Sequence, residues 1–343
     1  MFSVTNERGF VPQSEQFEGR DMVGDDIKAY KIIQSQEFAY NPARINVGSI
    51  AMYSGKAPCM ISSLYVCFKT TQKVDDEWLM QLLKTAKLNY CYNVNGEGGV
   101  RVYLFYPNFA RIRVSLPSLT EQKKIACLLN LLDERISTQN KIIEDLKKLK
   151  CAIIEKLYSE IQGKEYLYGQ LFEVVNKRNK QMEYSNILSA SQEKGMVNRD
   201  DLNLDIQFER SNINTYKIVR AGDYVIHLRS FQGGFAFSDK QGVCSPAYTI
   251  LRPNCLLEYG YLSYYFTSHR FIKSLIIVTY GIRDGRSINI EEWLNMKVII
   301  PSKEYQLHTL KILRSIEGKI ENEETYTICL SNQKQYLLNQ MFI

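Results

Sequence analysis

Apolar residues recur at alternating steps of three and four through the middle of the chain, which is the spacing of a coiled-coil seam. The seam consists of Leu129, Leu132, Ile136, Ile143, Leu146 and Ile153, with Gln139 and Lys150 at two further positions. Residues 118–162 contain neither proline nor glycine, and Ser118 precedes Glu121 with the spacing of a capping box. The pattern predicts one amphipathic helix over 118–162, roughly 60 Å long at about 1.5 Å per residue, whose seam packs against a partner helix.

The partner helix is predicted in the same chain, over residues 302–343. With a shift of 184 residues, this segment repeats both the seam and its flanking residues. The aligned pairs include Pro117 and Pro301, Gln122 and Gln306, and Lys150 and Lys334. The second seam consists of Leu313, Ile316, Ile320, Leu330 and Leu337.

The repeat continues upstream of the helices, where coiled-coil composition cannot explain it. With a shift of 186 residues, Gly9 aligns with Gly195, Tyr30-Lys31-Ile32 with Tyr216-Lys217-Ile218, and Gly48 with Gly234; with a shift of 183, Ser62 and Tyr65 align with Ser245 and Tyr248. The chain is therefore predicted to contain two copies of a globular region followed by a long helix. The expected boundaries are 1–117, 118–162, 163–301 and 302–343.

Each globular copy combines short apolar or alternating segments with turn residues. Strands are predicted at residues 216–219, 224–228 and 245–251, with a strand-like run at 111–116 before Pro117. A helix is expected over 259–277, matched by 75–87 in the first copy. The predicted class is α+β, with strands curled into a compact sheet or partial barrel in each copy.

Composition restricts the classes of protein that the chain can represent. With 343 residues, 45% of them hydrophobic, the chain is long enough for two cored domains. It has no apolar run long enough to span a membrane and no signal-peptide pattern, so we expect a cytoplasmic protein. The eight cysteines form no C-x-x-C pair, which favours buried free thiols over disulfides or zinc ligands.

Motifs for catalysis or metal binding are not recognisable in this sequence. The histidines, at 227, 269 and 308, have no suitably spaced metal-ligand neighbours. The Gly-rich stretch 95–101 lacks the Lys-Ser/Thr of a phosphate loop, and "NPAR" at 41–44 lacks the second proline and aromatic ring of an amino-methyltransferase motif. We therefore expect no catalytic residues and no metal site.

Several stretches resemble a known family. "LPSLTEQKKIACLLNLLDERI" from Leu116, "GFVPQSEQF" from Gly9 and "YKIVRAGDYVI" from Tyr216 are similar to the specificity subunits of type I restriction-modification systems. The resemblance covers essentially the whole chain. It implies that each globular copy is a target-recognition domain that reads one half of a split double-stranded DNA sequence, while the two helices pair antiparallel and fix the gap.

The resemblance also implies the partners and cofactors of the complex. Methylation subunits would dock around the helices and supply S-adenosylmethionine, and restriction subunits would add ATP-driven cleavage with Mg. No cofactor is expected on this chain itself. Self-association through the helices or through an open sheet edge is a further expectation.

The net charge of +6 suits a polyanionic partner, although any single basic residue can simply be a solvated surface charge. DNA contacts are expected from side chains on loops. The candidates are Arg44, Asn46, Arg101, Arg229, Gln232, Arg283 and Arg286. Arg229 can equally be a strand-end charge, and Arg101 and Arg286 can stabilise their loops by hydrogen bonds.

The two copies differ in their opening segments. Between Gln162 and Gly195 the second copy has 32 residues, including "YLYGQLFEVVNKR", whereas only eight residues precede Gly9. The first copy is therefore predicted to lack a strand and to have an open sheet edge, as in a truncated domain, a recombined cassette or a fragment. Two alternatives stay open at this point: a coiled-coil scaffold that binds proteins, and an inactive or recombinable specificity cassette.

Overall fold

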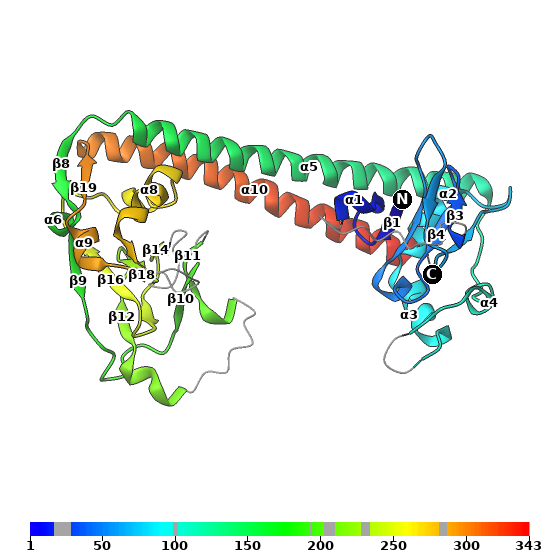
Figure 1. Ribbon diagram of the computed structural model, residues 1–343, viewed down its shortest axis with the longest axis horizontal. Coiled ribbons are helices and arrows are strands. Elements are labelled where there is room, and N and C mark those ends of the chain that lie inside the picture. Colours follow the sequence, from blue (N-terminus) through cyan, green and yellow to red (C-terminus); the bar gives the residue numbers. More distant parts are fainter. Residues whose placement is uncertain are drawn as a thin grey trace. The chain divides into compact units, whose positions relative to one another are not determined.

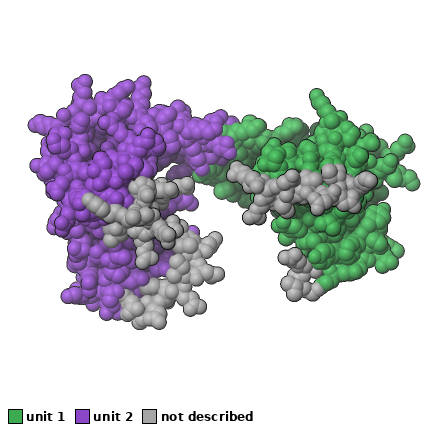
Figure 2. Space-filling view, viewed as in Figure 1, with its two compact units in different colours: residues 1–141, 324–343 green, residues 142–323 purple. Residues whose placement is uncertain are grey.

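A computed structural model describes residues 1–16, 29–98, 102–191, 194–201, 210–227, 234–280 and 287–342. The chain divides into two compact units (Figure 2). Unit 1 comprises residues 1–141 and 324–343, and unit 2 comprises residues 142–323. Each unit therefore contains one globular copy together with a part of both long helices. The predicted division into four consecutive segments differs from this one because it separated the helices from the globular copies.

Two long helices, α5 (Leu119–Ser159) and α10 (Lys303–Met341), match the segments in which the seams were found. The predicted capping box is present at the start of α5: Ser118 N–H donates to Glu121 Oε2 (3.0 Å), and Glu121 N–H donates to Ser118 Oγ (3.3 Å). Within each unit the helices run antiparallel. In unit 1, Lys334 Nζ lies 2.6 Å from Asp133 Oδ1, and in unit 2, Lys150 Nζ lies 2.6 Å from Glu317 Oε1.

Unit 1 has two small sheets (Figure 1). The first has the order β2-β1-β6-β3, with β1 at Phe2–Thr5, β2 at Gly9–Pro12, β3 at Lys31–Ile33 and β6 at Cys59–Ile61. The second has the order β5-β4-β7, with β4 at Phe38–Tyr40, β5 at Ile50–Met52 and β7 at Val66–Phe68. The helical elements are α1 (Gln13–Gln16), a 3-10 turn (Ile45–Val47), α2 (Asp76–Leu83), α3 (Ala86–Asn95) and α4 (Tyr106–Phe109).

Unit 2 repeats this plan with additional strands. Its largest sheet has the order β14-β13-β16-β9, with β9 at Phe172–Val175, β13 at Tyr224–Ile226, β14 at Phe235–Phe237 and β16 at Thr249–Pro253. The two-stranded pairs are β10 (Leu188–Ser191) with β11 (Gly195–Asn198), β12 (Lys217–Val219) with β15 (Gly242–Cys244), β17 (Thr279–Tyr280) with β18 (Ser287–Ile288), and β19 (Lys297–Ile300) with β8 (Lys164–Leu167).

The helical elements of unit 2 outside α5 and α10 are short. They are α6 (Tyr168–Leu171), α7 (Tyr261–Tyr265), α8 (His269–Ser274), α9 (Ile290–Leu294) and 3-10 turns at Arg199–Asp201, Arg210–Thr215 and Leu275–Val278. The predicted single helix over 259–277 is thus wrong in detail. Ser268 interrupts it, because its hydroxyl accepts the Phe271 N–H (3.2 Å) and caps a new helix.

The internal repeat is confirmed by strand register. In unit 1, Phe38 pairs with Met52 on one side and with Phe68 on the other. In unit 2, Tyr224, the residue aligned with Phe38, pairs with Phe237 and Leu251 at the corresponding positions. The hairpins β1-β2 and β10-β11 also share their register. Both copies are α+β, and their sheets are not closed into barrels.

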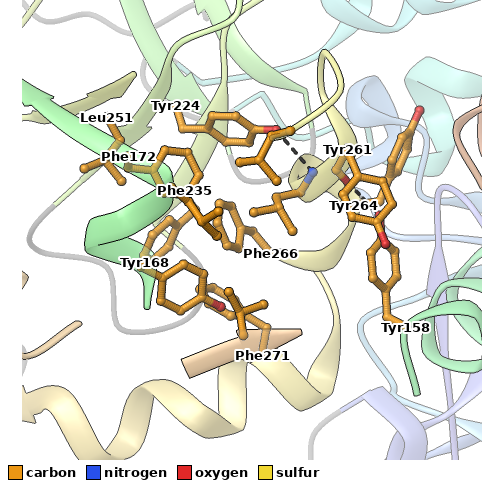
Figure 3. Close-up of a cluster of buried hydrophobic side chains, with 14 of the residues drawn as sticks. Tyr158, Tyr168, Phe172, Tyr224, Phe235, Leu251, Tyr261, Tyr264, Phe266 and Phe271 are labelled. Atoms are coloured by element: carbon orange, nitrogen blue, oxygen red, sulfur yellow. Dashed lines mark hydrogen bonds between the residues drawn. The ribbon is translucent and has the colours of Figure 1, made fainter. Parts of the chain in front are cut away.

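Aromatic residues dominate both cores. In unit 2 the rings of Tyr168, Phe172, Phe235, Phe266 and Phe271 gather between the main sheet and the short helices (Figure 3). Tyr168 also stacks on Trp293 with ring centroids 4.2 Å apart. Such contacts add about 0.5–1.5 kcal/mol per pair beyond the burial of apolar area.

The core of unit 1 draws on both the globular copy and the helices. Its largest buried side chains include Phe38, Tyr40, Trp78 and Tyr92. Leu129 of α5 and Leu338 of α10 belong to the same cluster. Their burial there is the reason why this part of each helix is amphipathic.

Two further expectations need correction. Residues 111–116 do not form a strand in the structure, although their sequence alternates. The cysteines are free as expected, but four of them (Cys127, Cys151, Cys255 and Cys329) are exposed rather than buried. Burial holds for Cys59 and Cys244, and it raises the pKa of the Cys244 thiol to about 12. Among the described residues, no helix is long and apolar enough to cross a membrane.

Candidate nucleic-acid interface

The loop between β4 and β5 presents two of the predicted DNA-contacting residues. The Arg44 carbonyl accepts hydrogen bonds from Val47 N–H (3.2 Å) and Ser49 N–H (3.0 Å), so backbone bonds order the loop while the Arg44 side chain is exposed. Gly48 ends the turn at φ +87°, and a Cβ there would lie 2.1 Å from Asn6 Oδ1. Only glycine fits this turn without displacing Asn6.

The same loop contacts the base of a second loop. Asn46 Nδ2 donates to Asn93 Oδ1 on α3 (3.2 Å), and Leu104 N–H donates to the Pro42 carbonyl (3.0 Å). Leu104 follows the isolated bridge between Glu97 and Tyr103. The structure therefore brings the segment of Arg44 and Asn46 next to the base of the loop that contains Arg101, while Arg101 itself lies outside the described residues.

Unit 2 places the corresponding candidates on the corresponding loops. Its two loops, residues 228–233 and 281–286, contain the remaining candidates Arg229, Gln232, Arg283 and Arg286, which all lie outside the described residues. The flanking segments are described: His227 N–H donates to the Gly234 carbonyl (2.7 Å), and β17 pairs with β18. Both copies thus have the same two loops as the place where candidate residues occur.

A third loop in unit 2 was not singled out from the sequence. Residues 176–183 follow β9 and line a surface hollow of about 580 Å³. Asn179 holds this loop: it is buried, its amide donates to the Tyr184 carbonyl (2.7 Å), and its N–H donates to the Tyr216 carbonyl (2.8 Å). The loop conformation is therefore built into the fold, although its other residues up to Glu183 are exposed.

The charge of this loop is positive. Lys177, Arg178 and Lys180 are exposed, and none of them forms an ion pair with an acid in the described part of the chain. Lys217 lies nearby: burial lowers its pKa, and repulsion from the Arg178 guanidinium lowers that pKa further. Crowded cations without a carboxylate partner favour an anionic ligand such as a phosphate. The signal in the sequence was the run "NKRNK" at 176–180.

A buried glutamine clamps each globular copy to the start of a long helix. In unit 1, Gln122 Oε1 accepts the Asp75 N–H (2.8 Å), and Gln122 Nε2 donates to the carbonyls of Pro117 (2.9 Å) and Lys73 (3.2 Å). All of these partners are backbone groups. The clamp therefore depends on the position of the chain and not on the identity of the partner side chains.

Unit 2 has the same clamp at the aligned residue. Gln306 Oε1 accepts the Glu258 N–H (2.7 Å), and Gln306 Nε2 donates to the carbonyls of Leu256 (3.0 Å) and Pro301 (3.1 Å). The two interhelical ion pairs repeat in the same way, because Asp133 aligns with Glu317 and Lys150 with Lys334 at the shift of 184. Each copy thus has the same attachment to the helices.

The predicted seam residues line the paired helices in both units. Leu129, Ile143, Leu313, Ile320 and Leu330 are buried, and Leu132, Ile136, Leu146, Ile153, Ile316 and Leu337 are partly buried. Several apolar residues on the outer faces of the helices are exposed, among them Leu131, Ile142, Leu149 and Ile328. Within the described ranges, no group of three or more His, Cys, Asp or Glu residues is arranged to hold a metal ion.

Comparison with known proteins identifies the family. Residues 26–148 match the family model of the type I restriction modification DNA specificity domain. The putative type I restriction enzyme MjaX specificity subunit of Methanocaldococcus jannaschii is 22% identical over 343 residues, which covers 93% of this chain and 80% of the relative. The MjaVIII specificity subunit of the same organism is 25% identical over 328 residues, with coverage of 86% and 75%. The chain belongs to the specificity subunits of type I restriction-modification systems.

Solved structures show the same fold. This specificity subunit aligns with a chain from a structure of a type I R-M system, described for its complex assembly and conformational transition, with a TM-score of 0.60 and 15% identity. That alignment covers 91% of this chain and 83% of the other. It also aligns with the S subunit of a type I restriction-modification system from M. genitalium, with a TM-score of 0.52, 13% identity and coverage of 91% and 84%. The family match falls on the first copy, and the second copy repeats its strand order and register.

Proposed function

We propose that this specificity subunit reads a split DNA target, one half with each globular copy, and that α5 and α10 set the gap between the halves. The observation that carries the proposal is the repeated clamp. Gln122 and Gln306 tie each copy to the first turn of a long helix through backbone groups alone. A reader attached in this way keeps its orientation to the helix while its loops diverge.

Helix geometry and DNA geometry then define the spacing of the target. Two readers on one duplex must meet compatible faces of B-DNA, on which one turn spans about 34 Å. A helix the length of α5 extends over about 60 Å at 1.5 Å per residue, which is between one and two turns of DNA. A pair of such helices can therefore act as a ruler.

The loops would divide the work of recognition between them. Lys177, Arg178 and Lys180 would contact phosphates, which position a protein on DNA without reading its sequence. Base edges would be read from the paired loops that contain Arg44 and Asn46 in unit 1. The corresponding candidates, all outside the described residues, are Arg101, Arg229, Gln232, Arg283 and Arg286.

The chemistry would belong to other subunits. Methylation subunits would dock on the helices, where Leu131, Ile142 and Leu149 leave apolar surface exposed. They would supply S-adenosylmethionine for adenine methylation, and restriction subunits would supply the ATP- and Mg-dependent steps. This chain would contribute specificity and no catalytic group, in a complex that acts on DNA in the cytoplasm.

Selection from random duplex DNA tests this function. The subunit, alone and with its methylation subunit, would be incubated with a random-sequence library, and the bound molecules would be sequenced. The proposal predicts enrichment of two short motifs separated by a constant gap. Enrichment of one motif would show that only one copy reads DNA, and a lack of enrichment in both conditions would contradict the DNA-reading function.

The phosphate role of the third loop has its own test. The triple variant Lys177→Ala/Arg178→Ala/Lys180→Ala should weaken binding about equally for all sequences, and each lost contact should reduce the slope of log affinity against log salt by about 0.9. The triple variant Lys123→Ala/Lys124→Ala/Lys148→Ala removes the same charge from exposed positions on α5 and should preserve the slope of the subunit alone. Equal slopes for both variants would remove the loop from the interface.

A further inference from the structure

In unit 2, the segment Lys164–Val175 connects two separate parts of the globular copy. Its first strand, β8, pairs with β19, which immediately precedes α10. Its last strand, β9, pairs with β16 at the edge of the main sheet. Figure 1 shows the segment running from β8 through α6 to β9 along one side of unit 2. It therefore staples the end of the domain to its sheet.

Side chains between the two strands anchor this segment in the core. Tyr168 and Leu171 are fully buried, and the Tyr168 ring stacks on Trp293 of α9. The backbone is held as well: Tyr168 N–H donates to the Met296 carbonyl (3.1 Å), and Asn254 N–H donates to the Leu171 carbonyl (2.9 Å). The segment has two strands and an apolar turn, each with a distinct acceptor surface.

Unit 1 contains the same acceptor surfaces. Strand β7 is the counterpart of β16, because both pair with the preceding strand in the same register. Residues 113–116 align with β19 at the shift of 184, and α4 with Phe109 aligns with α9 and Trp293. Among the described residues, however, β7 pairs with β4 alone, and residues 113–116 pair with no strand.

Exposure shows the consequence of the unfilled place. Val298 and Ile300 of β19 are 7% and 5% exposed, whereas the aligned residues Val114 and Leu116 are 42% and 49% exposed. The sequence at 113–116 retains the alternation of a strand, so its failure to form one follows from the lack of a partner. Two strand edges and two apolar side chains of unit 1 are thus prepared for a partner that unit 2 has in place.

We propose that Val66–Phe68 and residues 113–116 form a composite docking edge for a strand–turn–strand segment from another polypeptide, with the chemistry of Lys164–Val175. Unit 2 indicates what the occupant must contain: a short strand, an apolar turn with an aromatic and an aliphatic residue, and a second strand. Addition of a strand to an open edge satisfies the unpaired backbone groups, and side chains at alternate positions give specificity. The proposal rests on the internal repeat and not on DNA reading.

A second copy of this chain is a poorer occupant than a separate polypeptide. In such a copy, Tyr168, Leu171 and Phe172 are already buried in its own unit 2. Donation of this segment would expose those side chains and leave β16 and β19 unpaired, so that one edge would be covered at the cost of another. A polypeptide whose equivalent segment is free has no such penalty.

The test uses the full chain and a synthetic peptide of residues 163–176 with a fluorescent label. Fluorescence anisotropy should show saturable binding at one site per chain, and hydrogen exchange should slow at residues 66–68 and 113–116 in the complex. A peptide with Leu171→Asp and Phe172→Asp should fail to bind. The double variant Val114→Lys/Leu116→Lys should reduce affinity for the peptide at least tenfold with an unchanged melting temperature, because both side chains are exposed in the free chain.

A variant on β19 gives the matched control. Ile299 is 44% exposed, so Ile299→Lys should leave peptide affinity unchanged. The proposal is overturned if the peptide does not bind, if protection appears on β16 and β19 of unit 2, or if residues 66–68 and 113–116 are already protected in the free monomer. Protection that appears only in a dimer of the chain would identify a second copy as the occupant and would likewise overturn it.

Discussion

The two globular copies agree in their backbone pairing and differ in how their sheets are finished. In unit 2, Asp223 is buried at the turn before β13, and its carboxylate accepts two hydrogen bonds of 2.9 Å from Arg252 of β16. The aligned residues of unit 1 are Glu37 and Lys69; Glu37 accepts the Gln34 N–H (2.9 Å), as Asp223 accepts the Arg220 N–H (2.9 Å), but no ion pair to Lys69 is formed.

This difference coincides with the presence or absence of β9. Arg252 lies on the strand that β9 covers, opposite Glu173 in the register. Lys69 follows β7, which is paired on one side only in the described structure, and it is exposed. The comparison teaches that the repeat preserves register and helix attachment, while interactions at the sheet edge depend on whether the edge is covered.

The largest effect is expected from a charge in the helix seam. Leu129→Asp and Leu313→Asp each place a carboxylate at a fully buried position that the repeat makes equivalent. Each should lower the free energy of unfolding by more than about 4 kcal/mol, because packing is lost and a charge is buried without a partner. Urea denaturation measures this, with the exposed Leu131→Asp as a control that should change stability by less than about 0.5 kcal/mol. A stable Leu313→Asp variant would break the equivalence of the two copies.

The next largest effect should separate the copies. Arg252→Ala leaves the buried Asp223 carboxylate without its cation and should lower the free energy of unfolding by about 2–3 kcal/mol. Lys69→Ala, at the aligned position, should change it by less than about 0.5 kcal/mol. Denaturant titration of both variants is the measurement. If the two substitutions had equal effects, the sheet edges would not differ as described.

The glutamine clamps should give smaller effects that are alike in the two copies. Gln122→Ala and Gln306→Ala each remove three hydrogen bonds to backbone groups, of which at least one is left buried and unpaired. The expected loss is about 1–3 kcal/mol for each, measured by denaturant unfolding. Lys123→Ala, an exposed neighbour on α5, is the control. A loss confined to one copy would show that only that copy is attached through its clamp.

The smallest effects are expected at the interhelical ion pairs. Lys150 and Glu317 are partly exposed, as are Lys334 and Asp133, so solvent screens both interactions. Double-mutant cycles with Lys150→Met/Glu317→Gln and Lys334→Met/Asp133→Asn should give coupling energies of about 0.5–1 kcal/mol that decrease as salt is added. Coupling that is insensitive to salt would contradict this assignment.

Periodicity allowed most of the architecture to be predicted. The seams and the repeat identified both long helices and the two-copy order, because heptad spacing and fixed shifts do not depend on distant contacts. The open edge of the first copy was predicted from its short opening segment, and β7 has one unpaired side among the described residues. The strand expected at residues 111–116 did not form, since alternation indicates a strand only when a partner is available.

The candidate site was less predictable. Gln122 and Gln306 were recognised as aligned residues, but their role as clamps depends on backbone groups near Asp75 and Glu258, far away in the sequence. The loop after β9 was visible only as a basic run. Its ordered conformation depends on Asn179 and on its contacts with Tyr184 and Tyr216, which composition does not reveal.

The central claim is that paired helices set the gap of a split DNA target. The most direct test removes one heptad from α5 and the matching heptad from α10, which shortens both helices by about 10 Å and preserves the seam. Selection from random DNA should then return the same two motifs with a gap about three base pairs shorter. Affinity should also fall, because three base pairs rotate the second half-site by roughly 100° around the duplex. Recovery of both motifs with the original gap would contradict the ruler.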